Sequence, residues 1–195
     1  MPSDPLNDEP ITTWLHAARE GDDEALSRLF EAVYPLLHRM AANKSGVHQN
    51  GALQPTMVVN ELYLKINQSQ AFNSADRKHF YATCSRAMRF IVADFARAAM
   101  SLKRGGEHDH CAFTNALASQ PDRSQELLDL HAALDQLDRF DSRLRELVEL
   151  KFFGGLTHSE IGALQSRSER SIKRDWVKAR AFLVASSQSA DTVPP

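Results

Sequence analysis

Apolar residues recur every three to four positions along most of the chain, which is the spacing of one buried face of an α-helix. Convincing period-two alternation is missing, and no Asn-Gly turn joins two alternating segments, so the pattern does not favour β-strands. The sequence therefore predicts an all-α protein, with helices near residues 11–20, 22–40, 56–66, 74–103, 124–138, 142–153, 158–165 and 169–186. Pro35 lies inside the second helix, where a proline should kink or split it.

Between the fourth and fifth predicted helices the pattern fades into RGGEHDHCAFTNALASQPDRS. A stretch of about twenty residues without a helical pattern is longer than most loops inside a compact domain. We therefore expect two small helical domains, residues 11–103 and 125–186, joined by a flexible linker at residues 104–124. Residues 187–195 should form a disordered tail.

The composition excludes several classes of protein. Apolar residues make up 43% and charged residues 25% of the chain, which is typical of a soluble globular protein. No apolar run approaches the ~20 residues that span a bilayer, and the acidic N-terminus is unlike a signal peptide. We therefore expect a cytoplasmic protein that does not bind a membrane.

The sequence offers little for catalysis or metal binding. It contains no nucleophile–base pair, Gly-rich phosphate loop or metal triad, so we expect neither an enzyme nor a small-molecule substrate. Cys84 and Cys111 are too few for a disulfide scaffold. Residues 107–111, EHDHC, contain two histidines and a thiol, but no second cluster completes a tetrahedral site. A polar linker is the better interpretation, and we expect no metal or cofactor.

Charge is unevenly distributed, although the formal net charge is only −2. Residues 167–180 contain six bases and two acids, and residues 76–104 contain seven bases and two acids. Residues 1–35 and 122–149 carry eight acids each. Two basic segments between acidic ones indicate two contact sites on one polyanion.

Residues 155–176, GLTHSEIGALQSRSERSIKRDW, predict two short helices in immediate succession. Thr157 and Glu160 have the spacing of a capping box, and Ser168 should cap the second helix. Ile172 and Trp176 form an i, i+4 apolar pair that should face the core. This layout is typical of a helix-turn-helix, whose second helix enters the major groove of DNA. The expected DNA contacts are Arg167, Ser168, Arg170, Ser171, Lys173 and Arg174.

Two other interpretations of this segment stay open. A plain helical hairpin with a solvated basic face has the same pattern, because charged faces are common on helices. Membrane binding is the weaker of the two, since Glu169 and Asp175 interrupt the basic face.

Longer segments carry a resemblance to a known family. ELVELKFFGGLTHSEI and RSIKRDWVKARAFL resemble region four of bacterial sigma factors of the extracytoplasmic-function (ECF) class, in the sigma-70 superfamily. WLHAAREGDDEALSRLFEAVYPLLHRMA, LQPTMVVNELYLKI and HFYATCSRAMRFIVADFARAAMSLKRGG are similar to region two, in the same order. The resemblance covers about residues 11–186 and implies a promoter-specificity subunit of RNA polymerase. Region four would read the −35 element as duplex, and region two would open the −10 element.

The turn between the two short C-terminal helices departs from the family pattern. Members commonly have a leucine followed by glycine there, whereas this chain has Gln165-Ser166 and then Arg167. The departure puts the turn geometry in question and adds Arg167 to the candidate DNA-contacting face.

The resemblance implies that the long helix near residues 74–103 binds the −10 element, where one DNA strand is held single. Bases on such a surface track the phosphates, while aromatic side chains receive unstacked nucleobases. Phe80 shares a helical face with Cys84, so we expect it in the core, whereas Tyr81 is expected to be exposed. The implied −10 contacts are Lys78, His79, Tyr81, Arg86, Arg89 and Arg97.

Residues 56–66 match the helix that docks on the β′ clamp helices of core RNA polymerase in the family. The implied contacts are Val59, Glu61, Leu62 and Lys65. Many members carry an acidic run just before this helix, but here no acid occurs between Gly51 and Asn60. An interface that lacks its charge complement should associate slowly or weakly.

The sequence thus resembles a branch of the class that lacks the acidic run and for which control by a Ser/Thr kinase has been proposed. Phosphorylation of Thr56 would add about −1.5 to −2 charges at the helix N-terminus, where the helix dipole favours an anion. Alternatively, Thr56 is only an N-cap that follows Pro55. The expected partners are core RNA polymerase (β′ clamp helices and β flap), promoter DNA, and either a Ser/Thr kinase or an anti-sigma protein.

A different class of protein also fits the basic segment at residues 167–180. A dimeric helix-turn-helix regulator would use residues 1–103 for sensing or dimerisation and would bind duplex DNA tightly without polymerase. Neither half shows sustained heptads, however. A purely protein-binding adaptor would leave both basic segments unexplained.

Overall fold

The computed structural model describes residues 9–44, 55–68, 76–103 and 121–190. These residues form helices and the short turns between them, without a β-strand, so the predicted all-α class is confirmed for the described part of the chain. In chain order the helices are α1 (Glu9–Arg19), α2 (Asp23–Lys44), α3 (Pro55–Gln68), α4 (Arg77–Lys103), α6 (Pro121–Phe140), α7 (Ser142–Phe152), α8 (His158–Leu164) and α9 (Glu169–Ala190).

Short polar side chains fix the starts of several helices, because the first amides of a helix have no partner inside it. Asp22 accepts hydrogen bonds from two amides of α2, Asp76 accepts one from His79 at 2.8 Å, and Asp141 accepts two at the start of α7. The positive N-terminal end of the helix dipole also stabilises these carboxylates. Local sequence therefore sets where these three helices begin.

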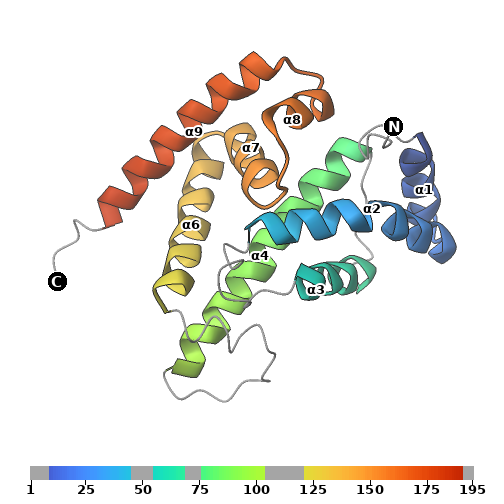
Figure 1. Cartoon of the computed structure of the whole chain (residues 1–195), viewed down its shortest axis with the longest axis horizontal. Helices are drawn as coiled ribbons and strands as arrows, with labels where there is room; N and C mark the ends of the chain where they lie inside the picture. Colours follow the sequence, from blue (N-terminus) through green and yellow to red (C-terminus); the bar gives the residue numbers. More distant parts are fainter. Residues whose placement is uncertain (1–8, 45–54, 69–75, 104–120, 191–195) are drawn as a thin grey trace.

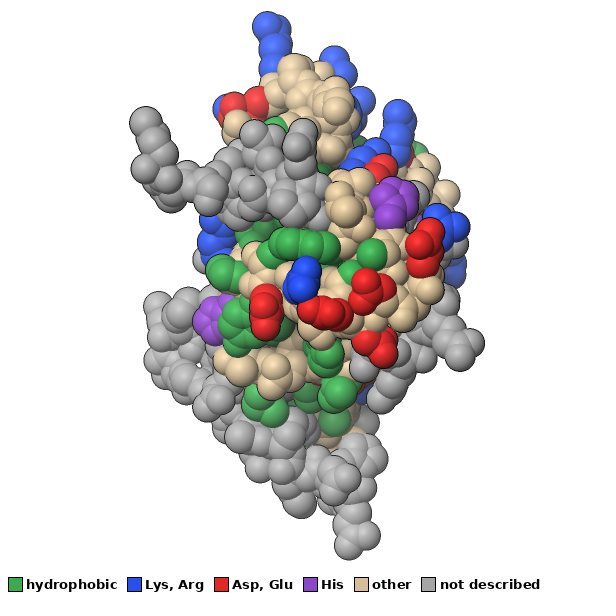
Figure 2. All heavy atoms as spheres, turned by 90° about the vertical axis from the view of Figure 1, so that its right-hand side faces the viewer, with side chains coloured by type: hydrophobic (Ala, Val, Ile, Leu, Met, Phe, Trp, Pro, Cys, Tyr) green, Lys and Arg blue, Asp and Glu red, His purple; other side chains and the backbone are tan. Residues whose placement is uncertain are grey.

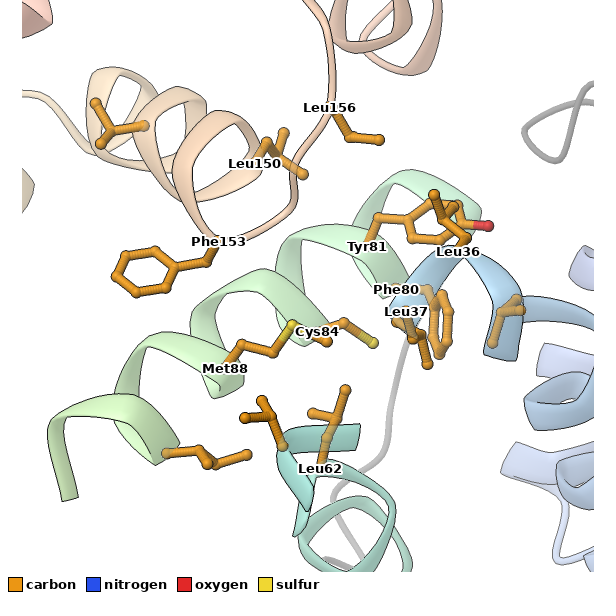
Figure 3. Packing of buried hydrophobic residues seen from close by; sticks show 14 of the residues in the cluster. Leu36, Leu37, Leu62, Phe80, Tyr81, Cys84, Met88, Leu150, Phe153 and Leu156 are labelled. Carbon is orange, nitrogen blue, oxygen red and sulfur yellow. The ribbon is translucent and has the colours of Figure 1, made fainter. Parts of the chain in front are cut away.

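The N-terminal half, α1 to α4, is built around one face of α4. Phe80, Cys84 and Met88 are almost completely buried on that face. Figure 3 shows them beside Leu37 of α2 and Leu62 of α3. Large apolar side chains of this kind each contribute about 1.5–3 kcal/mol when fully buried. The predicted burial of Phe80 is confirmed.

The C-terminal half, α6 to α9, packs directly on α4 rather than standing apart from it. α4 contacts both α6 and α7, and Figure 1 shows α4 running between the two halves. Leu150 and Phe153 of the α7 region face α4 from the side opposite Leu62 (Figure 3). The buried apolar residues form a single cluster from Ile11 to Ala179.

Helices extend past several of the predicted boundaries. α6 begins at Pro121, so the last residues assigned to the linker are helical, and proline is well suited to the first turn of a helix. α9 continues to Ala190, so residues 187–190 belong to this helix and not to a disordered tail. α2 passes through Pro35 without a split. The rest of the predicted linker, residues 104–120, lies outside the described residues.

α8 and α9 follow each other directly, as expected, but only α8 is short, since α9 has 22 residues. Thr157 and Glu160 form the predicted capping box, with hydrogen bonds of 3.1 and 2.7 Å. Ser168 accepts a hydrogen bond of 3.2 Å from the amide of Ser171 at the start of α9. Both predicted caps are confirmed.

The turn between α8 and α9 is tight, and the backbone of Arg167 lies close against Gly162. The amide of Arg167 donates to the carbonyl of Gly162 at 2.8 Å. A Cβ at position 162 would lie 2.7 Å from the Arg167 carbonyl oxygen. Ser166 has a φ of 54°, in the left-handed region where glycine is usually found. The chain thus makes the turn without the glycine that is common in the resembling family.

We predict that Gly162→Ala lowers the stability of the protein by about 1–3 kcal/mol, because the new methyl group would push against backbone atoms that have no room to move. Alanine is intrinsically the better helix former by about 1 kcal/mol, so propensity alone predicts the opposite sign. Urea unfolding of wild type and variant measures the difference.

Ala163→Gly is the matched control, since Ala163 is exposed in the same helix and its change tests propensity without a clash. A Gly162→Ala variant as stable as wild type would show that the turn is looser than the contact at Gly162 requires.

Candidate nucleic-acid interface

The first turns of α9 expose a cluster of basic side chains. Ile172 and Ala179 are fully buried, and Trp176 packs partly against the core, so one face of α9 is committed to the interior. The residues on the other face project into solvent, and Arg170, Lys173 and Arg174 are exposed there. Figure 2 shows Lys and Arg side chains at the top of the molecule, where α9 begins, with a few acidic side chains among them and more acidic ones over the middle.

Ion pairs hold part of this cluster in place. Lys173 binds Glu169 at 2.7 Å, and the hydrogen bond and charge of Lys173 hold the pKa of the Glu169 carboxyl below its usual value. Arg174 is 70% exposed and only 4.0 Å from Asp175. Arg170 forms no ion pair with any residue in the described ranges. The three bases therefore differ in how freely they can move to a phosphate or a base edge.

Asp175 organises the turn side of the cluster. It is mostly buried and forms an ion pair with Arg167, the residue that follows the unusual Gln165-Ser166 pair. Its other oxygen lies 3.9 Å from Lys178. Arg167 is thus held against α9 by an ion pair that offsets part of its charge.

His158 connects α8 to α9 beneath this surface. Its ring lies 5.9 Å from that of Trp176. Burial lowers the pKa of His158, and the charges of Lys151 and Lys173 lower it further. A neutral imidazole at this position adds no positive charge to the surface near neutral pH.

A second group of predicted contacts lies along α4 but does not form one surface. Lys78 and His79 are exposed at its start, and Arg97 is exposed about 29 Å away, given a rise of about 1.5 Å per residue. Arg97 pairs with Asp94 on the same helix at 2.7 Å. These three side chains are accessible in the structure.

Of the other three predicted −10 contacts, Arg86 and Arg89 face the C-terminal half, whereas Tyr81 lies beside Leu36 of α2 (Figure 3). Tyr81 is fully buried, so the expectation that it is exposed is wrong; its ring packs edge-on against Phe80 at 5.3 Å. Arg89 is 1% exposed and lies against Asp135 and Glu149. Arg86 is exposed, with 46% of its side chain accessible, and lies 3.9 Å from Asp138. As arranged here, Tyr81 and Arg89 have no access to DNA.

The predicted polymerase contacts on α3 divide between its two faces. Val59 and Leu62 are buried in the core, so their side chains are not available to a partner. Glu61 is partly exposed, and Lys65 is exposed beside Asp94 at 3.6 Å. The outward face instead presents Thr56, Asn60 and Leu64, the last 49% exposed. This i, i+4, i+8 set was readable from the sequence as the complement of the apolar stripe.

Thr56 is the second residue of α3, which begins at Pro55, so the interpretation of Thr56 as the N-cap is wrong. Proline fits the first helical position because its missing N–H has no partner there in any case. The first turn of α3 contains no acid, as the sequence predicted.

Sequence reasoning missed the acidic residues that bind the bases. Asp175 holds Arg167, and Asp135 and Glu149 hold Arg89. Only Glu149 had a local signal: it stands in the apolar run LVELKFF, four residues after Arg145, where an i, i+4 ion pair is expected.

No cluster of metal-ligating side chains occurs among the described residues. The EHDHC segment at residues 107–111 lies outside them. Across the part of the chain that the structure describes, no helix combines the length and apolar character needed to cross a bilayer.

Comparison with known proteins extends these observations. A family model described as ECF sigma factor matches residues 8–189, which include both helical halves and the α8–α9 unit. Searches of curated proteins and of solved structures gave no match. Because the family match covers nearly the whole chain, the protein belongs to the ECF sigma factor family, whose members are DNA-binding regulators that act with core RNA polymerase in promoter-directed transcription initiation.

Proposed function

We propose that this sigma factor reads a −35 element as duplex DNA with α8 and α9 and opens a −10 element with its N-terminal half. The observation that carries the proposal is the exposed basic cluster on the first turns of α9. It occupies the second helix of a helix-turn-helix, and the early residues of such a helix meet base edges in the major groove.

Each half takes one task in this proposal. Residues 125–186 form the −35 reader, in which Arg170 and Arg174 read bases while Lys173, Ser168, Ser171 and Arg167 contact the backbone or fix the helix on it. Residues 11–103 form the −10 unit, in which Lys78, His79 and Arg97 are accessible for phosphate contacts. Arg86 is exposed and is able to join them, although it lies 3.9 Å from Asp138, whereas the buried Arg89 joins them only after the two halves separate.

The outward face of α3 is the proposed contact with the β′ clamp helices. Leu64 supplies exposed apolar surface there, and Glu61 and Lys65 flank it. Region four would contact the β flap. An anti-sigma protein or a kinase would act on these same surfaces.

Transcription with purified core enzyme tests the proposal directly. We expect transcripts that begin at a defined set of sites when the sigma factor is added to core polymerase and genomic DNA, and none of these with core alone. Sequencing the transcript starts identifies the sites. Tight binding to duplex promoter DNA without polymerase, together with no transcription, would instead indicate a conventional regulator.

Variants of α9 test the roles of its bases. Arg174→Ala should cost roughly 1–3 kcal/mol in promoter binding by the holoenzyme and relax the preference at one −35 position. Lys173→Ala should weaken all promoters alike and flatten the dependence of binding on salt, because a phosphate contact carries no sequence information.

Binding to a panel of −35 variants at several salt concentrations separates the two effects. Arg180→Ala is the control, since Arg180 is an exposed base on α9 nearly two turns after Arg174. An Arg174→Ala holoenzyme with unchanged affinity and preference would show that the reading face has been assigned wrongly.

We also propose that phosphorylation of Thr56 strengthens polymerase binding. The side chain is exposed in the first turn of α3, where no acid is present, so about −1.5 to −2 charges would be added at a helix N-terminus that favours them. The phosphate would replace the missing acidic run opposite basic clamp residues.

Affinity for core polymerase should therefore rise several-fold on phosphorylation and stay at the unmodified level in Thr56→Ala. Thr13→Ala, an exposed threonine on α1, controls for the substitution itself. Equal affinity of the unmodified, phosphorylated and Thr56→Ala proteins would refute this control mechanism.

A further inference from the structure

α4 uses two opposite faces in two different ways. One face carries the apolar residues that bind α2 and α3, as Figure 3 shows for Cys84 and Leu62. The other face carries Arg86 and Arg89 and lies against α6 and α7. We call this second contact, between α4 and the pair α6–α7, the junction.

Charged side chains cross the junction. Nη2 of Arg89 donates to Oδ1 of Asp135 at 2.7 Å, and its Nε lies 3.3 Å from Oε1 of Glu149. Arg86 lies 3.9 Å from Asp138. Three carboxylates of the C-terminal half thus lie around two guanidinium groups, and carboxylate and phosphate bind arginine in similar geometry.

Further contacts close the two halves over a wider area. Arg39 of α2 binds Glu160 of α8 at 3.0 Å. Ser85 of α4 is fully buried against Gly154, where an added Cβ would lie 2.8 Å from its hydroxyl oxygen. The halves therefore meet closely along α4, and not through one ion pair alone.

Arg89 makes fewer hydrogen bonds than a permanently buried arginine would be expected to make. Among the described residues, Nε and Nη1 of Arg89 have no hydrogen-bond partner, although the side chain is 1% exposed. A buried charge with unmet donors keeps part of its desolvation cost. Water or a phosphate would meet those donors if the junction opened.

Opening does not leave the C-terminal half with an isolated charge. Glu149 also pairs with Arg145 of its own helix, and Arg145 binds Asp138 at 2.9 Å. These contacts lie within α6 and α7, so they persist when α4 withdraws. Glu149 and Asp138 of the C-terminal half therefore keep an ion-pair partner in either arrangement, and only the arginines of α4 need a new one.

We propose that the junction is an autoinhibitory contact: the acidic residues Asp135, Asp138 and Glu149 hold Arg86 and Arg89 of α4, so that the buried Arg89 is withheld from promoter DNA and the charge of the exposed Arg86 is partly neutralised, until polymerase and DNA separate the two halves. This inference rests on the proposed sigma function and concerns its regulation. If only open molecules bind DNA, the apparent affinity for DNA equals the affinity of the open form multiplied by the fraction of molecules that are open.

The test uses the full chain with Ser85→Cys as a reporter and Cys111→Ser, so that Cys84 is the one natural cysteine left. Ser85 is buried at the junction, so a thiol-reactive probe labels position 85 only when the junction opens. Cys84 stays unreactive, because it is fully buried and burial raises the pKa of its thiol.

We expect Asp135→Asn to raise the labelling rate about tenfold, because the variant loses a charge-assisted hydrogen bond that only the closed arrangement contains. Core polymerase with promoter DNA should accelerate labelling of the reporter protein as well. In the natural background, Asp135→Asn should also raise transcription several-fold at limiting sigma concentration and little at saturation.

Asp129→Asn is the matched control, because it removes the same charge from α6 while its partner, Gln125, lies in the same helix. Labelling rates that are equal in the reporter protein, its Asp135→Asn form and the polymerase complex would overturn the proposal. Faster labelling without any gain in transcription would overturn it too. A sigma factor that supports no promoter-directed transcription in any form would instead refute the proposed function, whatever its labelling rate.

Discussion

The carboxylate of Glu149 is the charge on which the arrangement of the molecule depends. It is fully buried in α7 and faces Arg145 from its own helix and Arg89 from α4. Burial raises the pKa of Glu149, while the charges of the two arginines oppose that rise. A buried ion that loses one partner costs about 3–5 kcal/mol, so Glu149 requires at least one arginine beside it at all times. Because Arg145 lies in the C-terminal half and Arg89 in the N-terminal half, Glu149 binds across the junction when the halves are closed and keeps Arg145 when they are apart.

The difference between contacts within one half and contacts between the halves explains which predictions from the sequence succeeded. Periodicity located the helices, and the spacing of Thr157, Glu160 and Ser168 located the caps, because these features depend on neighbours within one helix or turn. The exposed bases of α9 followed from its apolar stripe for the same reason. Its buried side is anchored by Ile172, which a local pattern is able to identify.

The predictions for α3 and α4 failed where the decisive neighbour is distant in sequence. Tyr81 and Arg89 look like surface residues in a basic segment, but α4 is covered on two sides, and the second cover comes from helices that begin beyond residue 120. Val59 and Leu62 were assigned to a partner by family position, although their spacing places them on the inward face. Position in a family motif predicts which helix contacts a partner, whereas helical spacing indicates which side chains of that helix are exposed to make the contact.

Charge distribution explains why a sigma factor of this design should need its polymerase. The net charge is −2, so the chain as a whole is not attracted to DNA, and only local clusters are. In the closed arrangement the exposed cluster on α9 is small, and each phosphate contact contributes a salt-dependent term of limited size. Arg86 and Arg89 are paired with carboxylates of the same chain, and under the proposed autoinhibition this makes both less available to DNA in the free protein. Binding energy from a large partner is then required to exchange carboxylates for phosphates, and that requirement keeps the free subunit from occupying promoters by itself.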